Sequence, residues 1–385
     1  MKKSISYGIT LNIILLGLAS FFMDIGGEII TAVLPLFLTS LGAGSIIIGL
    51  IGGFSDAGTS IFKIISGYWS DKTERRKPFV IFGYAFSSFS RFFIALATTW
   101  PLVMIFRPLE RLGKGIREPP RDALMAETTK RKVHGKVFGF HQTLDNAGAV
   151  IGSFLALILI GAAINFNKAI FIAALISFFA LIPLFFVKEK ARKLKKITLR
   201  IGLKGLSKKF KIFLLIISLF AIANFSYMFF MLKAQTIFNS YTITLLLFFI
   251  HNIFYVTFAF PGGMLSDKIG RKKVLILGYS LFALTCLGFA FMSSTVYQFA
   301  IIFSTYGISK ALVESNQRAM AADLASKELG TALGTFHMLV GLIALPAGLI
   351  AGLLWKISPS ATFIFGAAVS IIAALLFVFY KKLKV

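Results

Sequence analysis

Nine charged side chains lie inside long apolar stretches in the first half of the chain. Hydrocarbon cannot solvate such groups, so in membrane-spanning segments they usually pair with one another or line a path for ions or substrate. Five acids against four bases are close enough to balance for a paired network, which predicts a proton or substrate pathway. The acids are Asp24, Glu28, Asp56, Glu110 and Asp145, and the bases are Lys63, Arg91, Arg107 and Arg111.

Asp24 and Glu28 are one helical turn apart and therefore face the same side of a helix. Two carboxylates so close in a low-dielectric cavity cannot both stay ionised at low cost, which suits one of them to carry a proton. We expect Arg107 to pair with them in alternation, with Glu110 supplying part of its pairing from one turn away. The alternative is a static ion pair that only holds helices together.

The segments that carry these residues are long enough to cross a membrane. The 385-residue chain is 57% hydrophobic with a mean hydropathy of +0.84, and its apolar runs reach the roughly 20 residues that a spanning helix needs. Their continuous apolarity differs from the alternation of a membrane barrel. We predict an all-α integral membrane protein with twelve transmembrane helices in two six-helix bundles. The spans are 9–38, 45–70, 78–98, 101–124, 136–161 and 166–187, then 211–238, 241–265, 273–293, 296–321, 328–354 and 360–380.

Basic residues gather in the connections between spans and give the chain a formal charge of +26. One side of the membrane receives nearly all of them, and the other little beyond Lys168 and Lys356. The positive-inside rule therefore places both termini in the cytoplasm. Because the charge lies between helices, we expect membrane lipid rather than nucleic acid as its partner. A basic linker, residues 188–210, separates the first bundle (1–187) from the second (211–385), as a surface-bound or solvated tether.

One connection between spans occurs twice, about half a chain apart. Residues 67–77 read GYWSDKTERRK and residues 263–273 read GMLSDKIGRKK. Duplicated membrane bundles are typical of secondary transporters. Both loops resemble the cytoplasmic signature G-x-L-[AS]-D-[RK]-x-G-[RK]-[RK] of the major facilitator superfamily. The second copy fits fully, whereas the first has Trp69 and Glu74 in place of Leu and the second Gly.

This resemblance implies that the two loops are cytoplasmic latches. Asp71 is expected to face the positive N-terminus of a helix that starts near Ser326 in the other bundle. Basic residues of the loop would pair with acids, and Gly67 would let helices approach closely. The alternative is that the basic residues only fix topology. The latch residues are Gly67, Asp71, Arg75, Arg76, Gly263, Asp267 and Arg271.

Two further motifs resemble those of the same superfamily. Residues 107–115 read RPLERLGKG and are similar to R-x-x-[QE]-G-x-G, with Arg111 where Gly is usual. The wider string R-x-x-E-R-x-G-K-G-x-R-x-x-P-R-D-A-L resembles a branch of uncharacterised archaeal and bacterial members. Gly139, Gly148 and Gly152 have the spacing of the family's antiporter motif without its Pro, which favours export. Close helix packing explains these glycines equally well.

The expected function is secondary active transport of a small organic solute by alternating access, with proton-coupled efflux as first choice. Proton-coupled uptake of a metabolite and flipping of a lipid or amphiphile are the alternatives. The sequence contains no pattern for a nucleophile, a metal site or an ATP-binding loop. We therefore expect no enzyme activity, cofactor or metal, and a monomer that meets substrate, protons and lipid as a multi-pass protein of the cell membrane.

Overall fold

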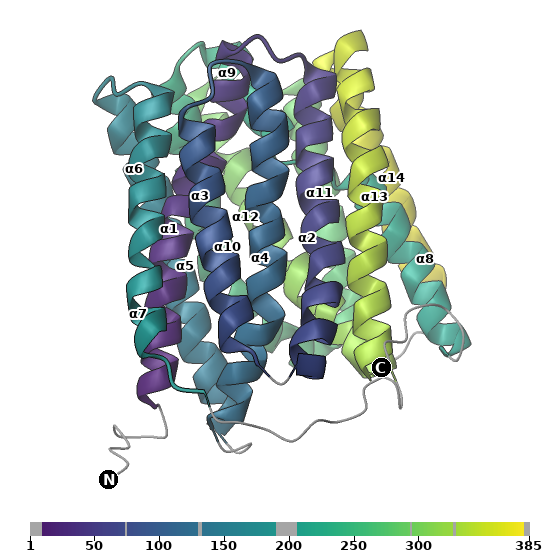
Figure 1. The fold of residues 1–385 in the computed structure, drawn as a ribbon. Helices are drawn as coiled ribbons and strands as arrows, with labels where there is room; N and C mark the ends of the chain where they lie inside the picture. Colours follow the sequence, from purple (N-terminus) through teal and green to yellow (C-terminus); the bar gives the residue numbers. More distant parts are fainter. Residues whose placement is uncertain are drawn as a thin grey trace. The chain divides into compact units, whose positions relative to one another are not determined.

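The predicted apolar runs are helices in the computed structural model, which describes residues 10–73, 75–129, 133–189, 206–292, 295–325 and 329–380 (Figure 1). Within this part of the chain no strand occurs. The helices are α1 (Leu11–Ser40), α2 (Ser45–Thr73), α3 (Lys77–Ala95), α4 (Trp100–Glu127), α5 (His134–Gly161), α6 (Phe166–Phe179), α7 (Leu181–Phe186), α8 (Lys208–Ala223), α9 (Met228–Phe238), α10 (Tyr241–Ile269), α11 (Arg271–Phe291), α12 (Val296–Leu324), α13 (Leu329–Ile357) and α14 (Pro359–Phe379).

Twelve spans account for these helices, which confirms the predicted fold class. Eleven are long and apolar enough to cross a membrane, counted over the described residues, and two of the eleven combine consecutive helices, α6 with α7 and α8 with α9. The twelfth span is α4, which is 28 residues long but carries too many charges to meet that criterion. The bounds agree with the predicted ones to within four residues.

The chain divides into two compact units. The first unit holds Met1–Gly42 and Gly58–Leu199, and the second holds Ala43–Ala57 and Arg200–Val385. The first turns of α2 therefore pack within the second unit, where Ser45 Oγ donates to the Gly352 carbonyl at 2.9 Å. Most of the predicted linker, 190–205, lies outside the described residues, as do Glu74 and Ser326.

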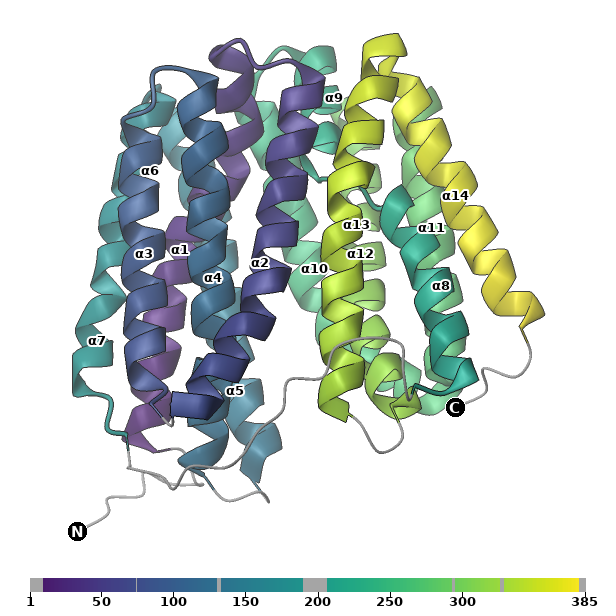
Figure 2. The same ribbon diagram turned by 45° about the vertical axis from the view of Figure 1, so that its right-hand side comes forward.

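Close helix crossings position the charged side chains of the first unit. In this unit α1 packs against α5 and α6, and α3 packs against α4 and α6 (Figures 1 and 2). A Cβ added at Gly83 of α3 would lie 2.7 Å from the Gly113 carbonyl of α4, so only glycine allows this approach. Gly148 plays the same part where α5 crosses α1, since its Cβ would lie 2.7 Å from the Phe21 carbonyl.

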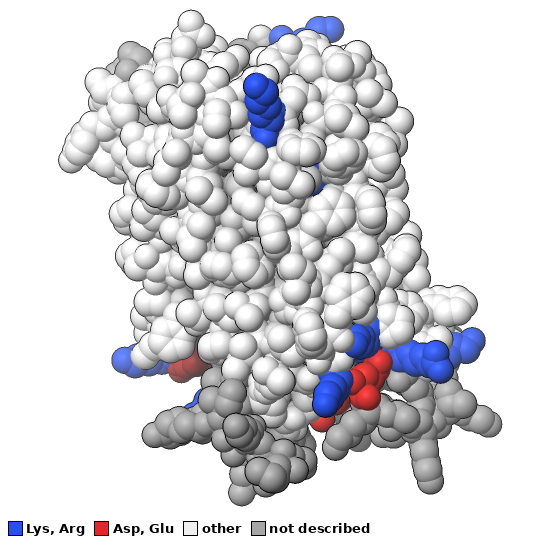
Figure 3. Space-filling model, turned by 60° about the vertical axis from the view of Figure 1, so that its left-hand side comes forward, with Lys and Arg blue, Asp and Glu red and all other residues white. Residues whose placement is uncertain are grey.

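The outside of the molecule is suited to a hydrocarbon environment. One face is uncharged over its middle, with most of its charged side chains at the lower end of the view and a few basic ones near the upper end (Figure 3). On α3 the side chains of Phe82, Phe89 and Phe93 are exposed. Exposed phenyl rings of this kind are stable in lipid, and the charges mark the polar boundary.

Candidate functional site

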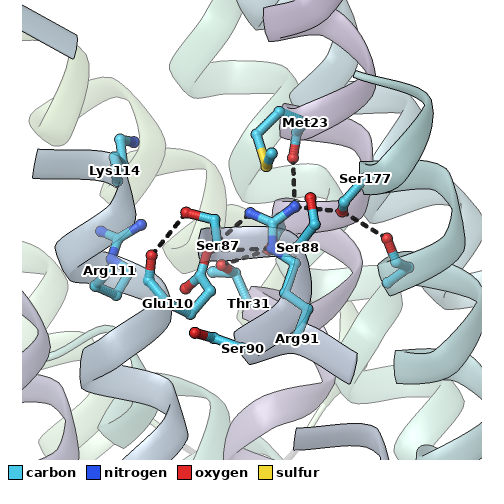
Figure 4. A network of polar contacts seen from close by, with 12 residues as sticks. Met23, Thr31, Ser87, Ser88, Ser90, Arg91, Glu110, Arg111, Lys114 and Ser177 are labelled. Atoms are coloured by element: carbon cyan, nitrogen blue, oxygen red, sulfur yellow. Dashed lines mark hydrogen bonds and ion pairs between the residues drawn. The ribbon is translucent and has the colours of Figure 1, made fainter. Parts of the chain in front are cut away.

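Buried charges of the first unit converge on Glu110 of α4 (Figure 4). Its Oε1 accepts hydrogen bonds from Arg91 Nη2 at 2.8 Å and Nε at 3.2 Å, and its Oε2 accepts from Arg107 Nη1 at 2.8 Å. Arg91, Arg107 and Glu110 are only 2%, 4% and 1% exposed. One carboxylate between two guanidinium groups offsets much of the cost of burying them and leaves one net positive charge. We call these three residues the arginine triad.

The arginine triad also connects four helices. Arg91, from α3, donates through Nη1 to the Met23 carbonyl of α1 at 2.8 Å and to Ser177 Oγ of α6 at 2.5 Å. Arg107 Nη2 donates to Thr31 Oγ1 of α1 at 3.3 Å. A Cβ at Gly27 of α1 would lie 2.7 Å from Arg91 Nη2, so glycine makes room for the guanidinium. The triad thus fixes α1, α3, α4 and α6 around one buried ionic centre.

A second polar group is built on Ser20 of α1. Its Oγ lies 2.7 Å from Tyr84 Oη of α3 and 3.0 Å from His141 Nε2 of α5, and accepts from Arg121 Nη1 of α4 at 2.9 Å. His141 Nδ1 lies 3.3 Å from Asp145 Oδ2 one turn along α5. Four of these five residues are buried, and the side chain of the fifth, Asp145, is 18% exposed. These residues, Ser20, Tyr84, Arg121, His141 and Asp145, are called the serine cluster below.

A third group consists of charges that are partly exposed. Lys63 Nζ lies 2.6 Å from Glu118 Oε2, and Lys114 Nζ lies 3.5 Å from Glu118 Oε1, with side chains 27%, 31% and 18% exposed for Lys63, Lys114 and Glu118. The α4 pair recurs 196 positions later on α12, where Lys310 Nζ lies 3.8 Å from Glu314 Oε1. Partly exposed charges within membrane-spanning helices are suited to line a water-filled path.

The repeated loops have the same ion-pair geometry in both units. Arg76 Nη2 lies 2.7 Å from Asp71 Oδ1 and 2.7 Å from Glu127 Oε1 at the end of α4. In the second unit Arg271 lies 2.8 Å from Asp267 and 3.2 Å from Asp323 at the end of α12. Arg76 therefore connects the α2–α3 loop to the end of α4, and Arg271 connects the α10–α11 loop to the end of α12.

The structure brings some predicted pathway residues together and separates others. Arg91, Arg107 and Glu110 form one centre, in which Arg107 contacts Glu110 and Thr31. Asp24 lies beside Gly148, where α1 crosses α5 one turn from Asp145. Glu28 lies against Gly152 of α5. Asp56 is exposed and belongs to the second unit, while Lys63, in the first unit, pairs with Glu118.

The predicted latch residues are also distributed unevenly. Arg76 and Asp71 are paired, and Arg75 is exposed beside them. A Cβ at Gly67 would lie 3.5 Å from Pro119, whereas one at Gly263 would meet nothing within 4 Å. The helix terminus proposed to face Asp71 lies outside the described residues.

Sequence reasoning named Asp145 but missed the other four members of the serine cluster and the role of Glu118. A usable signal was present, because Lys114 and Glu118, and likewise His141 and Asp145, stand four apart and so share a helix face. Arg117 was missed as well: it donates to Ser87 Oγ at 2.9 Å and lies 4.8 Å above the Tyr84 ring.

Two units of membrane-spanning helices, a repeated basic loop and ionisable residues buried between helices define a multi-pass membrane transporter. The family can be stated as well. The chain belongs to the Major Facilitator Superfamily, whose model matches residues 16–239 and 213–385.

Known proteins with the same features include sequence relatives and solved structures. An uncharacterised MFS-type transporter of Methanocaldococcus jannaschii is 46% identical over 377 residues, which cover 96% of this chain and 94% of the relative. The fosmidomycin resistance protein of Escherichia coli is 26% identical over 296 residues, 74% of this chain and 71% of that protein. A crystal structure of the nucleoside transporter NupG, as its D323A mutant, has a TM-score of 0.80 at 14% identity, covering 95% and 99% of the two chains. At this identity the last match concerns the fold alone.

Proposed function

We propose that this protein is a proton-coupled secondary transporter that exports a small organic solute by alternating access. Membership of the superfamily supports transport of a small molecule in general. The observation that carries the finer proposal is the density of ionisable side chains among the helices of the first unit. The charges of the arginine triad already pair with one another. In addition, α4 carries Lys114 and Glu118, whose side chains are partly exposed. Charges that remain accessible inside a membrane bundle are the usual means of binding and releasing ions.

Export is the preferred direction because the resistance proteins among the relatives are named for protection against a compound. These are the fosmidomycin resistance protein and, over 119 residues at 29% identity, the multidrug resistance protein MdtH of Photorhabdus laumondii. The partial antiporter spacing of Gly139, Gly148 and Gly152 favours the same direction. Uptake is the alternative outcome of the transport experiment below.

We infer that the α4 pair contacts the solute. Lys114 and Glu118 are 3.5 Å apart, which is longer than an optimal charge-assisted contact, and both side chains are partly exposed. An anionic group of the solute therefore competes for Lys114 at little desolvation cost, while Glu118 keeps its 2.6 Å contact with Lys63. The recurrence of this spacing as Lys310 and Glu314 supplies each unit with the same pair of opposite charges.

The transport test uses purified protein in liposomes with an imposed pH gradient and a panel of radiolabelled metabolites and drugs. We expect at least one solute to move only while the gradient lasts, and Lys114→Gln to reduce that movement at least tenfold. Lys168→Gln removes the same charge from an exposed position at the start of α6 and serves as the matched control. Gradient-dependent accumulation in the direction of uptake would reverse the proposed direction. Equal transport with and without the gradient would refute proton coupling.

We also propose that the two arginine-bridged loops are cytoplasmic latches. What supports this is the same Arg-centred contact in both units, at Asp71, Arg76 and Glu127 and again at Asp267, Arg271 and Asp323. A contact that closes one helix junction in each unit is suited to stabilise one conformer of the cycle.

A further inference from the structure

Two aspartates face each other where α1 and α5 cross closely. Asp24 belongs to α1 and Asp145 to α5, and their carboxylates interact electrostatically. The crossing is tight because Gly148, one turn beyond Asp145, has no side chain: a Cβ there would lie 3.2 Å from Asp24 Cβ. Two like charges held by helix packing repel each other unless one of them is neutralised.

Asp145 lacks a strong basic partner among the described residues. Its Oδ2 lies 3.3 Å from His141 Nδ1, while its Oδ1 is buried without a hydrogen-bond partner. An ionised carboxylate with one buried and unpaired oxygen is costly. The cluster around Asp145 therefore holds a carboxyl group whose charge is only weakly compensated.

Charged and titratable groups surround Asp145 from four helices, and the basic ones contact other acids. Arg121 of α4 is paired with Asp122 at 2.9 Å and donates to Ser20. Lys114 of α4 lies 3.5 Å from Glu118. The full set around Asp145 is Asp24 on α1, Tyr84 on α3, Lys114, Glu118 and Arg121 on α4, and His141 on α5.

The hydrogen bonds of Ser20 link the proton on Asp145 to the tautomer of His141. The hydroxyl has one hydrogen and already accepts from Arg121, which has no acceptor atom. Its hydrogen therefore goes either to Tyr84 or to His141 Nε2.

Each choice fixes the state of Asp145 while the imidazole is neutral. If Ser20 donates to His141 Nε2, the ring hydrogen sits on Nδ1 and donates to an ionised Asp145. If Ser20 donates to Tyr84, Nε2 carries the ring hydrogen and Nδ1 is an acceptor. The contact between His141 and Asp145 is then a hydrogen bond only if Asp145 holds a proton. A doubly protonated His141 would add a second positive charge beside Arg121, which opposes it.

We propose that Asp145 is the carboxyl group that binds and releases the transported proton, assisted by Asp24 and by reversal of the Ser20–His141 hydrogen bond. This inference rests on the proposed proton coupling. One proton enters the cluster, whose net charge rises by one. Asp145 takes the hydrogen of His141 Nδ1, and Nε2 takes the hydroxyl hydrogen of Ser20. Ser20 takes the hydroxyl hydrogen of Tyr84, which the incoming proton replaces. Protonation removes the repulsion between α1 and α5, and release of the proton restores it.

The proposal is tested without solute or gradient, by infrared difference spectroscopy of purified protein in lipid nanodiscs across a pH series. The wild-type protein should show a protonated carboxyl C=O band that titrates with pH. Asp145→Asn should abolish the band. Asp24→Asn should make it appear only at more acidic pH, because the repelling charge is gone. Glu189→Gln, at the end of the first unit, removes an acid outside the spans and should leave the band unchanged.

A band that survives in Asp145→Asn overturns the assignment, and a band that titrates alike in wild type and Asp24→Asn overturns the role of Asp24. His141→Gln should alter the titration of the band, and an unchanged titration removes the histidine from the mechanism. Asp145→Asn is nearly isosteric and should fold as the wild type does. Loss of the band counts only if the variant elutes from size-exclusion chromatography as the wild type does. If Asp145→Asn does not, Asp145→Ser is measured in its place. Failure of wild-type liposomes to couple solute to the gradient would refute the proposed function and leave the spectroscopic result unaffected.

Discussion

At the scale of single residues, Glu110 determines whether the buried charges of the first unit are tolerated. Both of its carboxylate oxygens accept from guanidinium groups, at 2.8 Å from Arg91 and 2.8 Å from Arg107. Removing the acid would leave two buried positive charges with no anion between them. Removing one partner of a buried ion pair therefore lowers the free energy of unfolding by much more than the intact pair contributes to it.

Glu110→Gln should lower the free energy of unfolding by about 3–5 kcal/mol, the cost of leaving a buried charge uncompensated. Thermal unfolding of purified protein, followed by fluorescence in detergent, measures the effect. Glu118→Gln is the matched control: its carboxylate is 18% exposed, so water replaces part of the lost contact and the loss should be clearly smaller. Equal losses for both variants would contradict a special role for the arginine triad.

The sequence named the members of the arginine triad and predicted the pairing of Arg107 with Glu110, which is confirmed, but not the pairing of Arg91 with Glu110. A charged residue within an apolar run can be recognised from the sequence alone, so Arg91, Arg107 and Glu110 could be selected as functional. Which acid meets which base depends on how α3 rotates against α4, and this is set by the contact of Gly83 with Gly113. The alternating pairing of Arg107 with Asp24 and Glu28 stays a prediction, because a one-turn spacing does not specify how α1 is rotated against α4.

At the scale of helices, the junctions α2–α3 and α10–α11 show how a short loop is held. Arg76 is the residue before α3, and Lys77 is the first residue of this helix. Their backbone N–H groups donate to the Glu189 carboxylate at 2.5 and 3.1 Å. An acid at a helix N-terminus is favoured by the helix dipole. The junction is thereby fixed both by a side-chain bridge to α4 and by an acidic cap.

Arg76→Gln should loosen this junction, because Asp71 and Glu127 lose their shared partner; charge-assisted hydrogen bonds contribute about 1.5–3 kcal/mol each. Hydrogen exchange should accelerate at the end of α2 and the end of α4, and the transport cycle should slow. Arg75→Gln removes the adjacent, exposed arginine and is the control. If both variants exchange alike, the bridge is only a source of positive charge that fixes topology.

Hydropathy predicted the spans well but not their interruptions. A run of apolar residues specifies where a helix can cross the bilayer, whatever its backbone does in detail. The sixth span breaks between α6 and α7, where Pro183 cannot donate to the carbonyl of Phe179, the last residue of α6. The seventh breaks between Ala223 and Met228. The first interruption lies in an apolar stretch marked by Pro183, and the second coincides with the polar residues Asn224 and Ser226.

At the scale of the whole molecule, the two units repeat a pattern of helices, the loop ion pairs and the Lys–Glu pair of α4 and α12, but not the arginine triad. Residues 195 or 196 positions after Arg91, Arg107 and Glu110 are Cys286, Phe303 and Tyr306. The ring of Tyr306 stacks on Phe230 and His251 at 4.3 and 4.4 Å. The second unit therefore fills with aromatic packing the place that the first unit gives to an ionic centre. Under the proposed function, proton chemistry belongs to the first unit.

Charge also differs between the two ends of each unit, and this difference predicts the orientation. In the first unit the α2–α3 junction and the end of α4 are joined through Arg76, and this end carries Lys72, Arg75 and Lys77. The opposite end of the unit has Lys168. In the second unit the α10–α11 junction carries Arg271, Lys272 and Lys273, with Lys356 at the far end of α13.

Reporter domains fused at Val385 or inserted near Arg200 should therefore report a cytoplasmic location, because Lys and Arg near the ends of spans are retained on that side. Alkaline phosphatase and a fluorescent protein, active on opposite sides of the membrane, provide the measurement. A reporter inserted between α5 and α6, in the connection that precedes Lys168, is the control and should read as external. Two cytoplasmic fusions flanking six spans require an even number of crossings in the second unit. An external signal at Val385 alone would remove one span from that unit, whereas external signals at both fusions would invert the molecule and place the arginine-bridged loops outside the cell.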